Sequence, residues 1–371
     1  MKVLALNHTS LVSGAERSLL TVLGALPSDV AMTVACPDGA LREAVRSAGA
    51  PTLSLTGTAG SLKLHLTHTP RTAAELVHAA LQLRRHTREL GADVVYANSI
   101  RAGIIAALAG LGTSVPLAVH VRDCLPAGPV ADRVLGLIRR RADLIIANSA
   151  YTEDHLRRTI PDAPIEVIHS PVDLDWLAAA PPRDTARQQL GLPATAPLLG
   201  VVAQLTPWKA QDDAIRVLAG VRRRFPDAEL LLVGSAKFVA SATRYDNVAF
   251  TNQLHSLAGE LGVADAVHFL GERDDVPAIL AALDVLLLPS WEEPFGSAVA
   301  EGMAAGLPVV ATAVGGPPEI IRDGVNGRLV APRDPDRWTA VVAELLENPG
   351  QRQAMGAAAR EAAAERLSAQ R

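Results

Sequence analysis

Short apolar runs alternate along the chain with longer stretches of helical spacing. The first half contains the runs "KVLALN", "VAMTVAC", "DVVYAN", "PLAVHV", "DLIIANS" and "IEVIHS". Between them, apolar residues recur every three or four positions, as they do along one face of a helix. A strand that is apolar throughout is buried on both faces, which is typical of a parallel sheet covered by helices on both sides. The first half therefore predicts a doubly wound α/β domain.

The same alternation starts again after residue 190, with the runs "PLLGVVAQL", "AELLLVGS", "AVHFLG", "DVLLLPS", "LPVVAT" and "GRLVAP". Residues 170–197 between the two sets are rich in Pro and Ala, which indicates a linker with a connecting helix. We predict two Rossmann-like domains, residues 1–175 and 176–350, that face each other across a cleft. Residues 351–371 are expected to form a C-terminal helix that packs back on the N-terminal domain.

Length and composition agree with this architecture. The chain has 371 residues, more than one compact core usually holds, and 49% of them are hydrophobic while 20% are charged. No apolar run approaches the ~20 residues that cross a bilayer, and the opening "MKVLALN" turns polar too soon for a secretory signal. We therefore expect a globular protein of the cytoplasm.

Charge and cysteine content exclude several function classes. The net charge is −4, and aromatic residues make up only 3% of the chain, too few for a surface that stacks nucleic-acid bases. The basic clusters at residues 83–90 and 139–143 suit an anionic membrane or acceptor, or are solvated helix faces. Cys36 and Cys124 indicate neither a disulfide framework nor a metal site.

Ligands of open α/β sheets bind beyond the carboxyl ends of the strands, so the loops that follow strands are the places to look for chemistry. The loop "NHTSLVSGAERSLL" follows the first strand. Its Ser13 and Glu16 have the spacing of a capping box, and Gly14 allows a ligand to approach the backbone. Either the box alone explains these residues, or the helix N-terminus offers its amides to an anion.

Two further loops carry polar groups. His120 and Asp123 lie at the expected end of the strand in "LAVHVRDCLP", where a histidine is either structural or part of a site. In "VVAQLTPWKAQDDAI", Gln204, Lys209 and a helix that opens near Gln211 place an amide, an ammonium group and a helix dipole around one loop. That combination suits a phosphate or diphosphate, although a solvated loop lysine is the alternative.

The stretch "EEPFGSAVAEGMAAGLPVVAT" carries two carboxylates around a Gly-Ser step. If a helix begins near Gly296, Ser297 and Glu301 lie one turn apart on one face, while Glu293 projects from the loop into the cleft. Each carboxylate can bind a hydroxylated group, with helix amides between them for phosphate, which describes a nucleotide-sugar. The alternative is a surface loop with two solvated glutamates.

This stretch resembles the E-x7-E signature of retaining glycosyltransferases of the GT-B fold, family 4. The resemblance continues through "GGPPEIIRDGVNGRLVAP" and extends to "SGAERSLL", "ANSAYTEDHL", "VIHSPVDLDWL" and "TPWKAQ", so it covers nearly the whole chain. It implies a GT-B architecture and a hexosyltransferase that uses no metal. Such an enzyme moves a sugar from a UDP- or GDP-sugar to an acceptor hydroxyl and retains the anomeric configuration.

The resemblance also implies roles for individual residues. His120, near the anomeric centre, and Glu293, on the donor-sugar hydroxyls, would be the catalytic residues. Glu301 would bind the nucleotide ribose and Lys209 the diphosphate, which Gly14 would approach from the N-terminal domain. The other donor-binding residues implied by the family pattern are Phe295, Gly296 and Ser297 at the sugar and phosphates, and Arg273 around the base.

Gln204 departs from the family pattern, because many members carry Arg at this position. A glutamine can only hydrogen-bond, whereas arginine carries a charge and a bidentate fork. Binding of the diphosphate would then rest on Lys209, the helix dipoles and the backbone, with Gln204 as a further hydrogen-bonding donor-site residue.

Other function classes fit the sequence less well. An NAD(P)-dependent oxidoreductase is also doubly wound, but the chain lacks G-x-G-x-x-G after a strand. A sugar-nucleotide epimerase of GT-B architecture, which needs no acceptor, is the alternative that remains. A non-catalytic sugar-binding protein is disfavoured because all the expected catalytic groups are present.

Metal and acceptor are the remaining expectations. The D-x-D stretches 173–175 and 334–336 have the form that chelates a divalent ion in other glycosyltransferases, but they fall in the linker and in a Pro-rich loop. We therefore expect no metal and no cofactor. Few aromatic residues lie in the first half, which favours a small-molecule or lipid-linked acceptor, with peripheral membrane contact in the second case.

Overall fold

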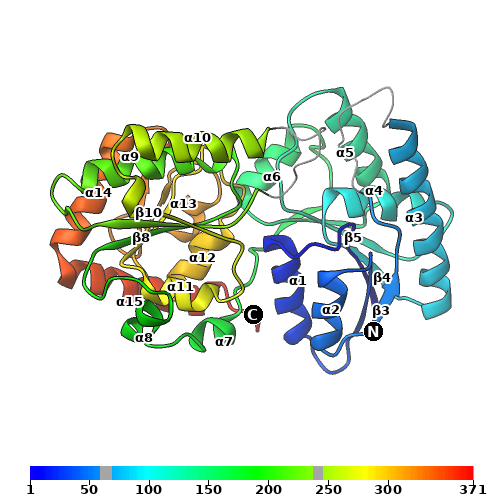
Figure 1. The fold of residues 1–371 in the computed structure, drawn as a ribbon. Helices are drawn as coiled ribbons and strands as arrows, with labels where there is room; N and C mark the ends of the chain where they lie inside the picture. Colours follow the sequence, from blue (N-terminus) through cyan, green and yellow to red (C-terminus); the bar gives the residue numbers. More distant parts are fainter. Residues whose placement is uncertain (59–68, 237–244, 371) are drawn as a thin grey trace. The chain divides into compact units, whose positions relative to one another are not determined.

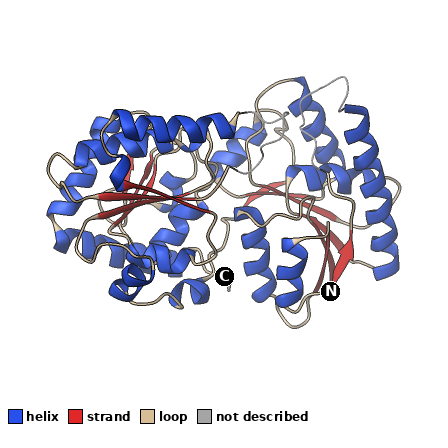
Figure 2. Ribbon diagram, in the orientation of Figure 1, coloured by secondary structure: helices blue, strands red, loops and turns tan. Residues whose placement is uncertain are grey.

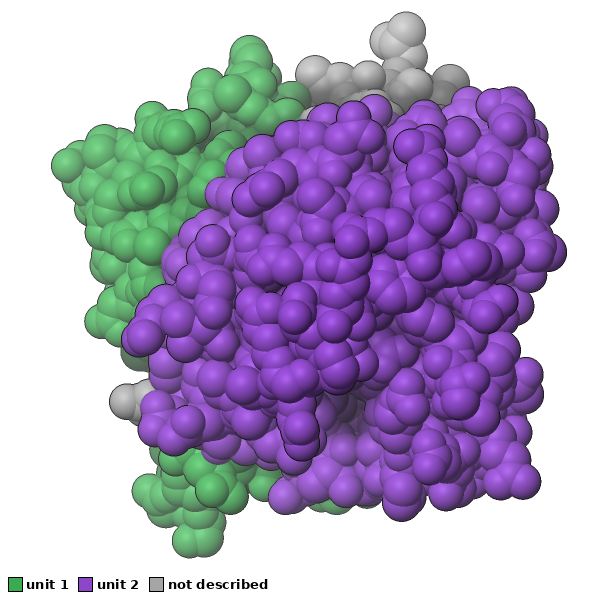
Figure 3. Space-filling view, turned by 90° about the vertical axis from the view of Figure 1, so that its left-hand side faces the viewer, with its two compact units in different colours: residues 1–171, 370 green, residues 172–369, 371 purple. Residues whose placement is uncertain are grey.

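The computed structural model describes residues 1–58, 69–236 and 245–370 (Figure 1). The chain forms two compact units: unit 1 comprises residues 1–171 with Gln370, and unit 2 comprises residues 172–369 (Figure 3). The boundary lies close to the predicted one at residue 175. In each unit the strands lie between layers of helices (Figure 2).

Unit 1 contains a sheet of seven strands that are all parallel to their neighbours. The order reverses direction between β1 and β4, which is the topological switch point of a doubly wound sheet. Across the sheet, the strands are β3 (Thr52–Ser54), β2 (Ala31–Cys36), β1 (Lys2–Leu6), β4 (Val94–Ala97), β5 (Leu117–Val121), β6 (Leu144–Ala147) and β7 (Ile165–Val167).

Helices cover both faces of this sheet. Successive residues of β1 point to opposite sides: Leu4 joins a core that includes residues of α3 to α6, while Val3 joins a second core with α1 and α2. This two-sided burial is the reason that the strands read as continuous apolar runs. The helices are α1 (Gly14–Gly24), α2 (Ala40–Ser47), α3 (Thr69–Leu90), α4 (Ile100–Ala109), α5 (Pro129–Arg141) and α6 (Ala150–Arg157).

Unit 2 contains a second parallel sheet, of six strands. Its order also reverses, between β8 and β11. The predicted fold class, two doubly wound parallel-sheet domains, is therefore confirmed. The strands in order are β10 (Val267–Gly271), β9 (Glu229–Val233), β8 (Leu198–Val202), β11 (Val285–Leu288), β12 (Val309–Thr312) and β13 (Arg328–Val330).

Two layers of helices also cover the sheet of unit 2. Leu199 packs in the core with α9, α10 and α14, and its neighbour Leu198 packs in the core with α11, α12 and α15. Short 3-10 turns lie at Pro207–Lys209 and Ala264–Ala266. The helices are α7 (Leu174–Ala178), α8 (Arg183–Gln189), α9 (Gln211–Val221), α10 (Asn247–Glu260), α11 (Val276–Ala282), α12 (Ser297–Ala304), α13 (Pro317–Ile320), α14 (Pro335–Glu347) and α15 (Pro349–Arg366).

Helix α15 packs against α12 within unit 2. Small residues explain the close packing. A Cβ on Gly356 would come within 2.1 Å of the Gly306 carbonyl oxygen, and Ala359 and Ala363 are fully buried. Arg360 Nη2 also donates to the Ala305 carbonyl oxygen at 2.8 Å. The expected packing of residues 351–371 on the N-terminal domain stays a prediction.

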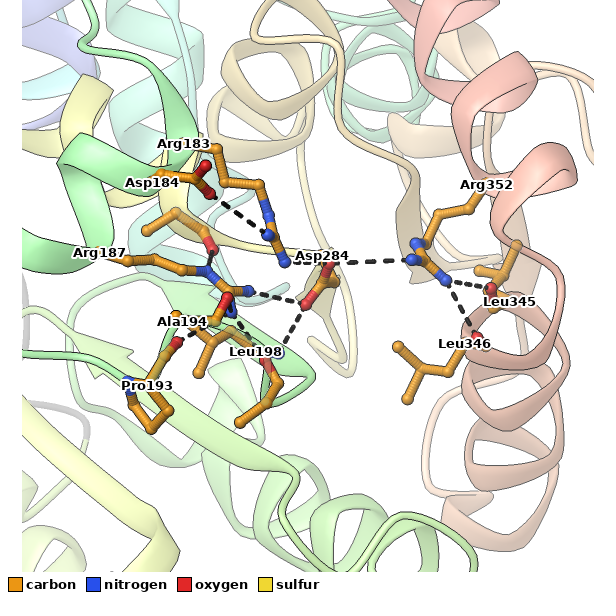
Figure 4. A network of polar contacts seen from close by, with 12 residues as sticks. Arg183, Asp184, Arg187, Pro193, Ala194, Leu198, Asp284, Leu345, Leu346 and Arg352 are labelled. Carbon is orange, nitrogen blue, oxygen red and sulfur yellow. Dashed lines mark hydrogen bonds and ion pairs between the residues drawn. The ribbon is translucent and has the colours of Figure 1, made fainter.

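An ionic network fixes the start of unit 2 at the end of the sheet where β8 and β11 begin (Figure 4). Asp284, just before β11, accepts hydrogen bonds from Arg183, Arg187 and the Leu198 amide, each at 2.9 Å. The side chain of Arg187 is 1% exposed, and it also donates to backbone oxygens such as that of Ala282 at 3.0 Å. The network anchors α8 of the predicted linker to the sheet.

Several arginines of the two basic clusters of unit 1 form ion pairs or hydrogen bonds within the chain. Arg85 pairs with Glu89 at 2.7 Å, and Arg84 donates to the Leu111 carbonyl oxygen at 3.0 Å. Arg141 donates to the carbonyl oxygen of Val115 at 2.7 Å.

Within residues 1–58, 69–236 and 245–370, no helix has both the length and the apolar composition that crossing a bilayer requires. Membrane contact stays a prediction.

Candidate active site

The two glutamates of the E-x7-E stretch lie at the start of α12, as the spacing predicts. Gly296 caps the helix with φ at 96°, a left-handed conformation that glycine adopts without steric cost, and Ser297 is the first helical residue. Glu301 lies on the second turn and is partly buried. Glu293 precedes the helix and is only 6% exposed. The sequence placed these elements correctly but did not predict the burial of Glu293.

Glu293 forms an ion pair with Lys209. Lys209 Nζ lies 2.5 Å from Glu293 Oε2, and the Ser290 hydroxyl donates to the same oxygen at 3.1 Å. The lysine also lies over the Trp208 ring, with Nζ 4.0 Å from the ring centroid, a favourable cation–π distance. Two residues that the sequence analysis assigned to different parts of a ligand, Lys209 to the diphosphate and Glu293 to the sugar, are therefore paired with each other.

A pair of glycines holds the Glu293 loop from the side of β12. A Cβ on Gly315 would lie 2.0 Å from the Glu293 carbonyl oxygen, and the Gly316 amide donates to that oxygen at 2.8 Å. Only glycine fits between these two backbones. Both glycines lie in the stretch that carries the family resemblance, but no role was predicted for them.

The Lys209 loop is held by a strained backbone conformation and by hydrogen bonds to neighbouring segments. Ala210, which follows the lysine, has φ at 52° and is fully buried, and an L-residue in this conformation costs about 1 kcal/mol. The Trp291 amide donates to the Trp208 carbonyl oxygen at 2.9 Å, which joins this loop to the Glu293 loop. The backbone carbonyl oxygen of Gln204 accepts from Gln211 Nε2 at 2.9 Å.

Two helix N-termini meet Lys209 at this edge. Helix α9 follows β8 and α12 follows β11, and these strands are neighbours at the point where the sheet order reverses. Neither cap residue, Ala210 or Gly296, supplies a side-chain acceptor to its helix. The first amides of both helices, together with the ammonium group, therefore make this edge suited to a diphosphate.

Phe295 and Arg273 have local partners. Phe295 is 2% exposed and packs in the same core as Val299, so its ring supports the loop from within the unit. Arg273, in the loop after β10, makes two hydrogen bonds to Asp275, at 2.8 and 2.5 Å. These bonds lower the pKa of the Asp275 carboxyl. The role of Arg273 around a base stays a prediction.

In unit 1, the capping box that Ser13 and Glu16 predicted is present. Glu16 Oε2 accepts from the Ser13 amide at 3.0 Å and from its hydroxyl, and Gly14 is the first residue of α1. Glu16 is only 3% exposed and also accepts from Asn7 Nδ2 at 3.1 Å. The box accounts for Ser13 and Glu16, while the part of Gly14 in ligand binding stays a prediction.

His120 is the fourth of five residues in β5 and is 5% exposed. Its Nδ1 lies 2.8 Å from the Tyr96 hydroxyl. Burial, and then the charge of Arg122, hold the pKa of His120 well below its usual range, so the imidazole is neutral near pH 7. Asp123, considered with it, is exposed. Tyr96 and Arg122 were not predicted as site residues, although both flank apolar strand residues at this edge.

Both D-x-D stretches cap helices. Asp173 Oδ1 accepts from the Trp176 amide at 2.9 Å, and Asp334 Oδ1 accepts from the Arg337 amide at 3.0 Å. Helix capping accounts for Asp173 and Asp334. In the described part of the chain, no three His, Cys, Asp or Glu side chains gather in a way that would hold a metal ion.

The sequence matches two family descriptions that together span most of the chain. "Glycosyltransferase Family 4" matches residues 12–176, and "Glycosyl transferases group 1" matches residues 182–362. The first match falls almost entirely in unit 1 and the second in unit 2.

Curated relatives include the D-inositol 3-phosphate glycosyltransferases of two bacteria. The protein of Mycolicibacterium vanbaalenii is 33% identical over 309 residues, which cover 80% of this chain and 64% of the relative. The protein of Streptomyces scabiei is 32% identical over 306 residues, which cover 78% of this chain and 68% of the relative. The chain thus spans less than two thirds of the first relative's length.

Solved structures resemble the whole chain. Anabaena HepE in complex with UDP-glucose has a TM-score of 0.84 and 27% identity, and the match covers 100% of this chain and 96% of HepE. Sucrose-phosphate synthase from Thermosynechococcus elongatus has a TM-score of 0.77 at 22% identity, covering 99% and 95% of the two chains, and thus shares the fold.

Proposed function

This chain belongs to the family 4 glycosyltransferases of the GT-B fold, and on that premise we propose that it transfers a hexose from a nucleotide-sugar to an acceptor hydroxyl with retention of configuration. The donor is held at the edge of unit 2 where α9 and α12 begin. The observation that carries this proposal is the ion pair of Lys209 with Glu293 between those two helices.

The ion pair allows Lys209 and Glu293 to exchange partners when the donor binds. The side chains of Lys209 and Glu293 are 13% and 8% exposed, and each neutralises the other in a setting where an unpaired charge would be costly. The negative charge of an incoming diphosphate replaces Glu293 as the ion-pair partner of the Lys209 ammonium group. Glu293 is then released to accept hydrogen bonds from the sugar hydroxyls, so nucleotide binding prepares the sugar site.

The remaining site residues complete the donor site in this proposal. The backbone amides of α12 and of the Lys209 loop bind the phosphates, and Gln204 adds hydrogen bonds where an arginine would add charge. Glu301 binds the ribose. The other donor contacts that the family resemblance implies are Gly14, Arg273, Phe295, Gly296 and Ser297.

We favour UDP-glucose as donor and a small hydroxylated molecule as acceptor. UDP-glucose is the ligand of HepE, which is 27% identical over the full chain. The curated relatives named after D-inositol 3-phosphate support a small polyol phosphate as the acceptor class to test first. The alternative donor is a GDP-sugar, and the alternative acceptor is a lipid-linked molecule.

The proposed chemistry is a front-face displacement. The acceptor hydroxyl attacks the anomeric carbon on the side from which the diphosphate departs, and the leaving phosphate oxygen takes the hydroxyl proton. His120 is neutral and hydrogen-bonds the sugar, so it orients the donor and stabilises the cationic centre without acting as a general base. Lys209 and the helix N-termini stabilise the charge that develops on the diphosphate.

Replacing Glu301 by Gln should weaken UDP binding by about 1–3 kcal/mol, the usual value of a hydrogen bond to a charged group. Isothermal titration calorimetry measures this loss directly. Inorganic diphosphate is the matched control ligand because it lacks ribose, and its affinity should not change. Equal losses for both ligands, or unchanged UDP affinity in a folded variant, would contradict the ribose role.

Activity should survive an excess of EDTA, because protein groups supply the positive charge that a metal provides in other glycosyltransferases. The check is the initial rate of UDP release with and without chelator, followed by addition of Mg²⁺ or Mn²⁺. Loss of activity with EDTA that either ion restores would mean that a metal takes part.

A further inference from the structure

A buried chain of hydrogen bonds in unit 1 joins the cap of α1 to His120. It runs along the carboxyl ends of β1, β4 and β5, which are neighbours in the sheet. Its first three links are hydrogen bonds of 3.1 Å each: Asn7 Nδ2 donates to Glu16 Oε1, Asn98 Nδ2 to Asn7 Oδ1, and Arg122 Nη2 to Asn98 Oδ1. The members in order are Glu16, Asn7, Asn98, Arg122, Tyr96 and His120.

The neighbours of Asn98 fix which way its amide points. Asn98 Nδ2 lies 3.2 Å from the Ala15 carbonyl oxygen, which can only accept. On the other side, Asn98 Oδ1 faces Arg122 Nη2, which can only donate. Exchanging the amide nitrogen and oxygen would break both contacts. Asn98 therefore presents an oxygen, and so an acceptor, to the region around Tyr96.

The position of that oxygen determines where the Tyr96 hydroxyl proton lies. The hydroxyl is 3.3 Å from Asn98 Oδ1, 3.5 Å from Arg122 Nη2 and 2.8 Å from His120 Nδ1. Asn98 Oδ1 only accepts, so Tyr96 must donate to it; otherwise two lone pairs would face each other in a buried site. The single hydroxyl proton is then used, and the His120 ring must supply the proton of the 2.8 Å contact.

We propose that Tyr96 is a positioning residue that holds His120 as the neutral tautomer with the proton on Nδ1, so that Nε2 is a hydrogen-bond acceptor. This inference rests on the proposed function for its consequence in catalysis but not for its geometry. His120 Nε2 is buried and has no hydrogen-bond partner within the described residues. Unprotonated Nε2 can therefore accept a hydrogen bond from a ligand, and a sugar hydroxyl is a group that can donate one.

The opposite tautomer would leave two defects. With the proton on Nε2, a buried N–H would have no acceptor in the described part of the chain, and Tyr96 would have to donate to Nδ1 and turn a lone pair towards Asn98 Oδ1. Buried polar groups without partners are costly, so the network selects the Nδ1–H form. Arg122 adds to this, because its positive charge next to the ring opposes a second proton.

The tautomer can be read from the nitrogen chemical shifts of the full chain labelled with ¹⁵N-histidine at pH 7. The chain has 10 histidines, and a His120→Gln variant identifies the signals of interest by their disappearance. We expect Nδ1 to resonate as a protonated, pyrrole-type nitrogen and Nε2 as an unprotonated, pyridine-type nitrogen. The reverse pattern in the wild-type protein would overturn the proposal whatever the activity.

Tyr96→Phe removes the hydroxyl and keeps the ring. We expect the His120 signals to shift towards the Nε2–H form, while Tyr245→Phe in unit 2, the matched control, leaves them unchanged. With UDP-glucose, turnover of Tyr96→Phe should fall roughly tenfold or more, as expected when a catalytic histidine is in the wrong tautomer, with UDP affinity retained. His120 signals identical to wild type in a folded Tyr96→Phe protein would overturn the positioning role. The nitrogen spectra need no substrate, so an incorrect donor would leave this test intact.

Discussion

Replacing Glu293 by Gln should lower turnover by about 10²–10³-fold while leaving UDP affinity unchanged or higher. The substitution keeps the shape of the side chain and removes the charge that pairs with Lys209 at 2.5 Å. Lys209 then meets the diphosphate without first giving up a partner, so binding does not weaken. The sugar, however, loses the carboxylate that accepts from its hydroxyls in the transition state.

The neighbour Glu292 provides the matched control, because it has the same charge one residue earlier and its side chain is exposed. Glu292→Gln should retain the turnover of the wild-type protein. Initial rates at saturating donor give turnover, and calorimetry with UDP gives affinity. A Glu293→Gln enzyme with wild-type turnover, or one that loses UDP binding in proportion to its rate, would refute the separation of the two roles.

Replacing Asp284 by Ala should destabilise unit 2 by about 3–5 kcal/mol, the usual cost of removing one partner of a buried ion pair. The Arg187 guanidinium, 1% exposed, would stay in the core without its carboxylate. Its bonds to neutral backbone oxygens satisfy hydrogens but do not balance the charge. The Leu198 amide at the start of β8 would also lose its acceptor.

Tryptophan fluorescence is suited to this measurement because all four tryptophans of the chain lie in unit 2. Urea unfolding followed by tryptophan fluorescence reports the unfolding of unit 2 separately from that of unit 1. This separation matters because a chain of two units need not unfold in one step. Asp184→Ala is the control: its carboxylate is 94% exposed and 4.0 Å from Arg183, so the midpoint should not move. An Asp284→Ala midpoint equal to that of the wild type would contradict the role of the network.

The sequence predicted most strands because buried parallel strands are apolar on both faces. All six runs of the second half became β8 to β13, and Gly296 marked the start of α12 at the residue expected. The strand β3 was not predicted. It has three residues, Thr52–Ser54, lies at the sheet edge and is not apolar throughout, so it gives no periodic signal.

Contacts between residues far apart in the chain could not be predicted from local patterns. The side chains of Lys209 and Glu293 form an ion pair although 84 positions separate them, and spacing within a loop contains no information about such a partner. The same applies to Tyr96 and His120, on neighbouring strands but 24 positions apart. Helix α15 had small residues in its sequence, but their partner at Gly306 emerges only from the fold.

The configuration of the product tests the central claim most directly. The protein is incubated in EDTA with UDP-glucose, an α-configured donor, and a set of small polyol and hexose phosphates that begins with D-inositol 3-phosphate. Proton NMR then assigns the anomeric linkage while UDP release is measured in parallel. We expect an α-linked glucoside with one UDP released per bond formed. A β-linked product, or an epimerised nucleotide-sugar without UDP release, would contradict it.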